Sequence, residues 1–170
     1  MSNQTTTFSN WNAFYQRYVL IFNVIVVISL VPFGWMYLQL EHGLFQPYFS
    51  NGSIQWIGAG VMLPIIAYGL LRSYKDAQKN ILAIPRDFSV RNKLANYYKL
   101  QMRKFVIYEM MAIVSLVGML IFQPIVFAIF YIFILFVFSL DWPKYVKVVE
   151  HLRLSKEEQE VLATSEVLPK

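Results

Sequence analysis

Glu109 is the residue whose chemistry stands out, because it is the one side chain charged at neutral pH within the apolar stretches of this chain. An acid in apolar surroundings either binds a proton or cation in a transport path or accepts hydrogen bonds that fix helix packing. Asn23 and Tyr68 lie at a similar depth in two other apolar stretches, and we expect them, or Arg72, to be its polar partners. We favour the packing role, because transport paths normally carry several polar groups at the midplane.

Other chemical constellations are missing from the sequence. The chain has no cysteine, which excludes disulfides, thiolate metal sites and a cysteine nucleophile. His42 and His151 are expected on opposite sides of a membrane, so they would not share a metal ion. No phosphate-binding glycine loop, HExxH or GxSxG motif occurs. We therefore expect no catalysis, no metal site and no cofactor.

The elements that position Glu109 follow from where cations are absent. No Lys or Arg lies between Tyr18 and Leu71 or between Phe105 and Pro143. Since a helix needs roughly 20 apolar residues to cross a bilayer, these two stretches predict an all-α membrane protein, a single domain over residues 1–170 with four transmembrane helices. The predicted spans are residues 18–40, 54–71, 105–122 and 125–140, with the last two separated at Gln123-Pro124.

The remaining segments carry the cations and are predicted to be cytoplasmic, because Lys and Arg in short loops stay inside. Both termini, the loop of residues 72–104 and the tail of residues 141–170 then face the cytoplasm. The first apolar run is too long for a cleaved signal peptide, so we expect the first helix to be retained. The third helix should begin near Ser89 and continue without a break to about Phe122.

The tail is predicted to be helical. Val146, Val149 and Leu152 recur at helical spacing and indicate a short interfacial helix. Ser155 and Glu158 form a capping-box pattern that opens a last helix ending near Thr164. This acidic segment either folds back on the basic loop or stays solvated, and the sequence leaves both possibilities open.

The loop between the second and third spans is strongly basic. Near an anionic leaflet each cation contributes about 1 kcal/mol, so the loop is a candidate docking surface for lipid headgroups or an acidic partner. The bias of cations toward the cytoplasm already explains many of them, and we favour that explanation. The net charge of +5 belongs to this face and indicates anionic lipid rather than nucleic acid. The cations are Arg72, Lys75, Lys79, Arg86, Arg91, Lys93, Lys99, Arg103 and Lys104.

Residues 102–162 carry a resemblance. A KFVIYE run at residues 104–109, the tight turn at Gln123-Pro124, an aromatic fourth span, Pro143-Lys144 and an LRLSKEE run at residues 152–158 follow one another in order. This order resembles uncharacterised four-helix inner-membrane proteins of the Bacteroidota type. The resemblance implies a bacterial inner-membrane location and no particular activity.

Three classes of function fit this sequence. The first is a non-catalytic integral-membrane subunit or scaffold of a larger bacterial inner-membrane assembly, which we favour because the outer loops are short and the helices offer packing surface. The second is a small oligomeric ion or proton channel or carrier that uses Glu109. The third is a membrane-surface adaptor that docks lipid or cytoplasmic partners through the basic loop. Expected partners are anionic lipid, together with other membrane-protein subunits or further copies of the chain.

Overall fold

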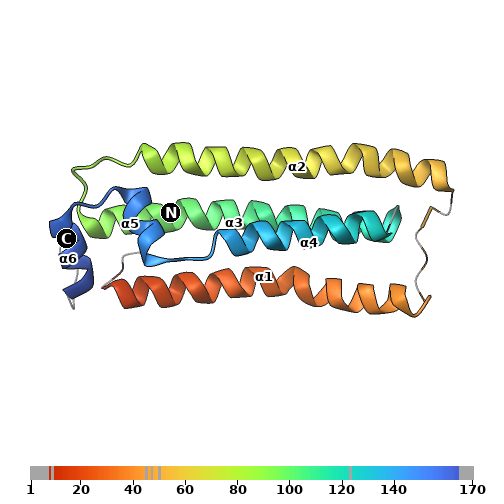
Figure 1. The fold of residues 1–170 in the computed structure, drawn as a ribbon, viewed down its shortest axis with the longest axis horizontal. Coiled ribbons are helices and arrows are strands. Elements are labelled where there is room, and N and C mark those ends of the chain that lie inside the picture. Colours follow the sequence, from red (N-terminus) through yellow and green to blue (C-terminus); the bar gives the residue numbers. More distant parts are fainter. Residues whose placement is uncertain are drawn as a thin grey trace, which may run out of the picture. The chain divides into compact units, whose positions relative to one another are not determined.

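The computed structural model of the chain describes residues 8, 10–44, 46, 48–49, 51–122 and 124–164. Every regular element in those residues is a helix, as the sequence predicts, and no strand occurs among them (Figure 1). In chain order the helices are α1 (Trp11–Glu41), α2 (Gly52–Leu82), α3 (Val90–Ile121), α4 (Pro124–Leu140), α5 (Tyr145–Leu152) and α6 (Lys156–Thr164).

Three helices, α1, α2 and α3, are long and apolar enough to cross a membrane. They have 31, 31 and 32 residues, or about 47–48 Å at 1.5 Å per residue, against roughly 30 Å for a hydrocarbon core. α4 has 17 residues, about 25 Å, and passes the same test only when it is counted with α5 as one bent span. Pro32 and Pro64 lie inside α1 and α2 without ending either helix.

The ends of α3 and α2 can be set against the boundaries predicted from the sequence. α3 runs from Val90 to Ile121, which confirms the predicted unbroken third helix. α2, in contrast, continues to Leu82 and makes the first third of the predicted loop helical. The signal for this extension is a buried stripe at helical spacing that outlasts the apolar run: Ile66, Leu70, Ser73, Ala77 and Ile81. The predicted turn residue Gln123 and the tail beyond Thr164 lie outside the described residues.

The chain divides into two compact units by its internal packing. The first unit comprises the described parts of Met1–Phe22, Lys75–Lys104 and Pro143–Lys170, and the second comprises those of Asn23–Tyr74 and Phe105–Trp142. The second unit covers most of the predicted spans, whereas the first covers segments that the sequence places in the cytoplasm. Within the described residues, all of the Lys and Arg residues except Arg72 fall in the first unit.

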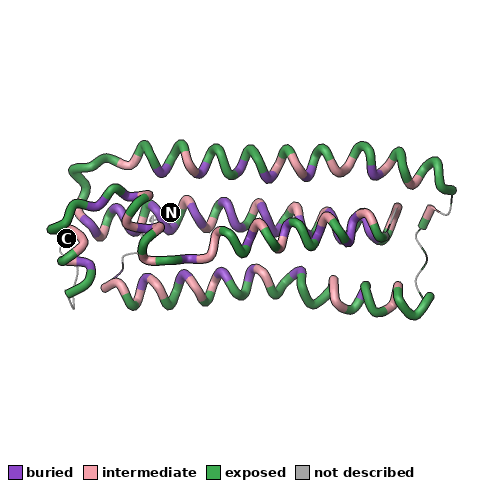
Figure 2. Tube along the Cα trace, viewed as in Figure 1, coloured by how far each residue is buried: buried purple, intermediate pink, exposed green. Residues whose placement is uncertain are grey.

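α3 is the most deeply packed of the three long helices. Half of its apolar window is buried, compared with 22% for α1 and 17% for α2. Figure 2 shows the same contrast, with exposed positions along most of α2. In the second unit small residues of α3 and α2 let neighbouring side chains approach closely: Gly118 faces the Phe127 ring of α4, and Gly58 of α2 faces the Phe122 ring at the end of α3. α3 thus forms the core of the second unit.

The first unit has an aromatic core. The Phe8 ring lies 5.1 Å from Phe14 and 5.2 Å from Tyr98 of α3, both in edge-on geometry. Trp11 meets Tyr145 of α5 edge-on at 5.2 Å. Edge-to-face pairs of this kind add about 0.5–1.5 kcal/mol to the burial of each ring. The start of α1 and the helical tail therefore both pack on the N-terminal part of α3.

In the tail, the predicted cap of α6 is present, whereas the predicted buried side of α5 is only partly correct. The backbone N–H of Glu158 donates to Ser155 Oγ at 3.2 Å, and the N–H of Ser155 donates to Glu158 Oε2 at 2.9 Å, which confirms the capping box. In α5 the expected stripe was wrong in part. Val148 and Leu152 are buried and Val146 is exposed, because packing selects residues four apart rather than every third one.

Candidate functional site

Glu109 is buried in the second unit, where it belongs to a chain of hydrogen bonds between three helices. Its side chain is 7% exposed. Ser29 Oγ of α1 donates to Glu109 Oε2 at 3.1 Å, and Tyr131 Oη of α4 donates to Ser29 Oγ at 3.1 Å. Each hydroxyl in this chain uses its proton for the next acceptor, so the order of donors is fixed.

The hydroxyl chain is held in place by packing. Tyr131 is fully buried, and its ring stacks on Phe33 of α1 at 4.2 Å. Six residues beyond Glu109 on α3, Ser115 donates to the Phe127 carbonyl of α4 at 3.0 Å. The second carboxylate oxygen, Glu109 Oε1, is also buried, and it accepts no hydrogen bond from a described residue. The site therefore offers one satisfied and one unsatisfied carboxylate oxygen.

The expected partners of Glu109 were wrong, although its inward orientation was correct. Asn23 is exposed on α1, and Tyr68 is exposed on α2. Tyr68 instead accepts a hydrogen bond from Arg72 Nη1 at 3.3 Å, and the Arg72 guanidinium lies 5.9 Å from the same ring. Sequence depth placed Asn23 close to Glu109, but the register between α1 and α3 selects Ser29, six residues or about 9 Å further along α1.

A signal for Ser29 was present in the sequence. The buried side of α1 repeats large aromatic or apolar side chains at intervals of three or four residues up to Ser29 and then of seven to Met36, and Ser29 is the one small polar member of that series. A hydroxyl on a buried apolar stripe needs a partner across the interface. The series is Phe14, Tyr18, Phe22, Ile25, Ser29 and Met36. Tyr131 carried a comparable signal, because it is the one tyrosine of α4, whose other aromatic residues are all Phe.

The predicted basic docking surface is smaller than the sequence indicates. Six of the nine cations are exposed: Arg72, Lys75, Lys79, Arg86, Lys99 and Arg103. Arg91 is partly buried, whereas Lys93 and Lys104 are 3% and 4% exposed and lie within packed structure. These two lysines therefore do not belong to a headgroup-binding surface. The sequence placed them there because charge alone does not reveal which side of α3 packs.

Lys93 has a structural role in the first unit. Its Nζ forms a salt bridge of 2.5 Å with Glu158 Oε1 of α6. Burial alone raises the pKa of Glu158, but the hydrogen bonds from Lys93 and from the Ser155 backbone, with the Lys93 charge, outweigh it and hold the pKa below its ordinary value. One turn along α3, Tyr97 Oη and His151 Nδ1 share a hydrogen bond of 3.2 Å. The acidic tail thus folds back on α3.

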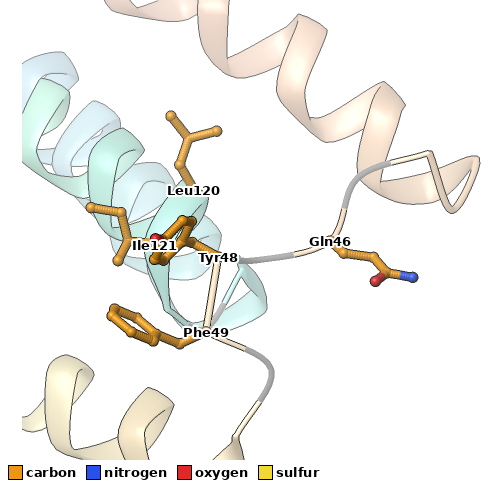
Figure 3. Close-up of a pocket in the computed structure, with 5 residues that line it drawn as sticks. All are labelled: Gln46, Tyr48, Phe49, Leu120 and Ile121. Atoms are coloured by element: carbon orange, nitrogen blue, oxygen red, sulfur yellow. The ribbon is translucent and has the colours of Figure 1, made fainter.

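An open apolar depression of about 580 Å³ lies at the end of α3 (Figure 3). Tyr48 and Phe49 come from the segment between α1 and α2, and their backbone N–H groups donate to the carbonyls of Leu120 and Ile121 at 3.2 and 3.1 Å. These bonds satisfy carbonyls that the last turn of a helix leaves unpaired. Gln46, the fifth lining residue, points away from the other four. The depression thus lies where the backbone of Tyr48 and Phe49 caps the C-terminal end of α3.

Among the described residues, no three His, Asp or Glu side chains lie close enough to hold a metal ion. Comparison with protein-family models, with curated proteins and with solved structures finds no match to this chain.

Proposed function

We propose that the chain is a four-span integral membrane protein of the bacterial inner membrane with both termini in the cytoplasm. The agreement between packing and charge supports this topology, because the second unit carries almost all of the apolar spans and a single cation, Arg72. Arg72 lies near the end of the second span, where a long side chain reaches the interface. α4 is about 25 Å long, and local thinning of the bilayer accommodates it.

In this membrane the protein acts as a non-catalytic subunit or scaffold of a larger assembly. The observation that carries this proposal is Asn23, a polar residue that lies exposed on α1 within the predicted first span. Lipid covers the apolar residues around it but offers an amide no partner at that depth. A neighbouring transmembrane helix does, and polar side chains commonly join helices in membranes.

The exposed cations give the protein a second contact, with the headgroups at the inner face of the membrane. Lys75, Lys79, Lys99 and Arg103 belong to the helical parts of the first unit and remain accessible. At about 1 kcal/mol each near an anionic leaflet, they hold the first unit against phosphate headgroups.

The experiment is purification of the tagged protein in a mild detergent at native expression, followed by mass spectrometry. A stoichiometric set of other membrane proteins is expected with the wild-type chain. Asn23→Leu should reduce their recovery, whereas Val24→Ala, the neighbouring exposed position, should retain it. Recovery of the chain without other membrane proteins in both cases would contradict the assignment as a subunit.

A second candidate function, a proton or cation carrier, is favoured by one observation: the buried and unpartnered Oε1 of Glu109. Ser29 and Tyr131 would orient the carboxyl group while Oε1 bound the transported ion. Reconstitution into liposomes with a pH-sensitive dye tests this candidate. Glu109→Gln should then abolish flux while the protein still folds. A wild-type flux no greater than that of empty liposomes would exclude this candidate.

A further inference from the structure

The carboxyl group of Glu109 is buried in the second unit without a positive charge to pair with. Ser29 is the one described residue that bonds to it, and its hydroxyl group is neutral. Among the described residues of this unit Arg72 is the one Lys or Arg, and it is exposed and donates to Tyr68. An isolated carboxylate costs far more than a neutral carboxyl group in apolar surroundings, so such a group takes up a proton instead.

The partners of Glu109 indicate how deep the carboxyl group lies in the proposed membrane. Ser29 is the central residue of the predicted span 18–40, and Tyr131 lies close to the centre of the span 125–140. Glu109 itself is nearer the inner end of its span. The carboxyl group therefore lies between the inner end and the middle of the hydrocarbon core, where an ionised acid needs a partner from the protein.

The oxygen atoms around Glu109 do not suit a metal ion. Ca²⁺ takes about six to eight oxygen ligands, and Mg²⁺ demands near-ideal octahedral geometry. The hydrogen-bonded chain brings together one carboxyl group and two hydroxyl groups. Ser29 directs its proton at Glu109 Oε2, and Tyr131 directs its proton at Ser29, so one lone pair of each acceptor is already used. A proton needs a single lone pair and no further ligand.

The hydrogen bond from Ser29 decides which carboxyl oxygen carries the proton. In a neutral carboxyl group the carbonyl oxygen is the better acceptor, and the other oxygen holds the hydrogen atom. Because Ser29 Oγ donates to Oε2 at 3.1 Å, Oε2 is the carbonyl oxygen. Oε1, which is buried and has no described partner, is then the hydroxyl oxygen. Tyr131 is a positioning residue, because it acts on the carboxyl group through Ser29.

We propose that Glu109 is a proton-binding site inside the membrane, with the proton on Oε1 at neutral pH and Oε2 bonded to Ser29. Binding forms one O–H bond at Oε1 and leaves the group neutral, and release restores the carboxylate. This inference rests on the proposed insertion in a membrane. It deepens the carrier candidate, for which it names the ion as a proton.

Infrared spectroscopy of the protein in lipid at neutral pH tests the protonation state. The chain has ten Asp and Glu residues, and exposed acids are ionised at this pH. The wild type is expected to show the carbonyl-stretching band of a protonated carboxyl group, and Glu109→Gln should lack it. Absence of the band from the wild type, or its presence in Glu109→Gln at wild-type intensity, would overturn the proposal.

The frequency of the same band tests which oxygen carries the proton. Ser29→Ala should move the band to higher frequency, because the carbonyl oxygen loses its hydrogen bond. Ser115→Ala is the matched control: it removes another buried serine hydroxyl of this unit, one that donates to the Phe127 carbonyl instead. A band at the wild-type frequency in folded Ser29→Ala would overturn the assignment of the proton to Oε1.

Tyr131→Phe provides a second variant if Ser29→Ala does not fold, which the amide bands of the same spectra report. It keeps the donor to Glu109 but removes the hydrogen bond that polarises Ser29. A smaller shift in the same direction is therefore expected, and no shift relative to the Ser115→Ala control would count against the arrangement.

Added cations and proton flux separate the failure of this inference from the failure of the carrier candidate. A wild-type carboxylate band that shifts with Na⁺, K⁺ or Ca²⁺ and is missing from Glu109→Gln would overturn the inference but leave a cation carrier possible. A protonated band that these cations do not change supports the inference. If that band is present and wild-type flux equals that of empty liposomes, the proton site stands and the carrier candidate fails.

Discussion

At the scale of single residues, three polar side chains of the second unit, Glu109, Ser29 and Tyr131, meet one another across helix interfaces. Ser29 is the central member, because it accepts from Tyr131 and donates to Glu109. Hydrogen bonds of this type in membrane proteins contribute about 0.6 kcal/mol on average and up to about 1.7. Such a network orients α1, α3 and α4 more than it stabilises them.

Tyr131→Phe is expected to destabilise the protein by about 0.5–1.5 kcal/mol, because it removes the donor to Ser29 and keeps the stacked ring. Glu109→Gln should cost less than Glu109→Leu, since glutamine still accepts from Ser29. Unfolding in detergent followed by tryptophan fluorescence measures these differences. Tyr48→Phe, which alters an exposed tyrosine, is the control, and a Tyr131→Phe effect no larger than the control effect would argue against the network.

Glu158→Gln should release α6 from α3, because it leaves the buried Lys93 ammonium without its anionic partner. The expected cost is on the order of 1–3 kcal/mol, compared with about 0.5 kcal/mol or less for the exposed neighbour Glu157→Gln. Hydrogen exchange of the α6 amides measures the free energy of opening. Equal protection of α6 in the two variants would contradict this role of Lys93.

The same pair predicts how the tail responds to pH. Folding lowers the pKa of Glu158, so its contribution is complete above the ordinary value of 4.5 and is lost as the pH falls through the lowered folded value. Exchange of the α6 amides should therefore be constant from neutral pH to about pH 5 after correction for intrinsic rates, and should rise below it. In Glu158→Gln this acid-dependent step should be missing.

At the scale of elements, close packing depends on where α3 lacks side-chain bulk. Gly118→Ala should destabilise the contact between α3 and α4 by about 1–3 kcal/mol, because the added Cβ would collide with the fully buried Phe127 ring. Gly60→Ala in α2 meets open space and should be neutral or slightly stabilising, since alanine favours helix. Thermal unfolding of the two variants in the same detergent compares them directly, and equal melting temperatures would contradict the packing described.

The elements were more predictable from sequence than the contacts between them. The unbroken α3 and the Ser155–Glu158 capping box follow from local patterns, and both are present. The extension of α2 and the partner of Glu109 depend on how far each helix is rotated and shifted against its neighbour. Side-chain packing over the whole interface sets these two quantities, so depth along a single helix did not identify Ser29.

At the scale of the whole molecule, the distribution of cations predicts a topology that fusion reporters test. Reporters at both termini and at residue 85 should be cytoplasmic, and a reporter at residue 46 should lie on the opposite side. A fusion after Leu140 distinguishes four spans from three, because only a spanning α4 returns the chain to the cytoplasm. A cytoplasmic signal at residue 46 would show that the topology is wrong.

The three residues of the hydroxyl chain leave the ribosome at different times. Glu109 follows Ser29 by 80 residues and Tyr131 follows Ser29 by 102, so Glu109 leaves the ribosome 22 residues ahead of Tyr131. At 5–20 residues per second this interval lasts about 1–4 s. In the proposed topology the acid therefore enters the bilayer when its donor is already there but before the tyrosine that orients that donor has left the ribosome. A nascent chain released before α4 would hold Glu109 with a serine hydroxyl still free to rotate.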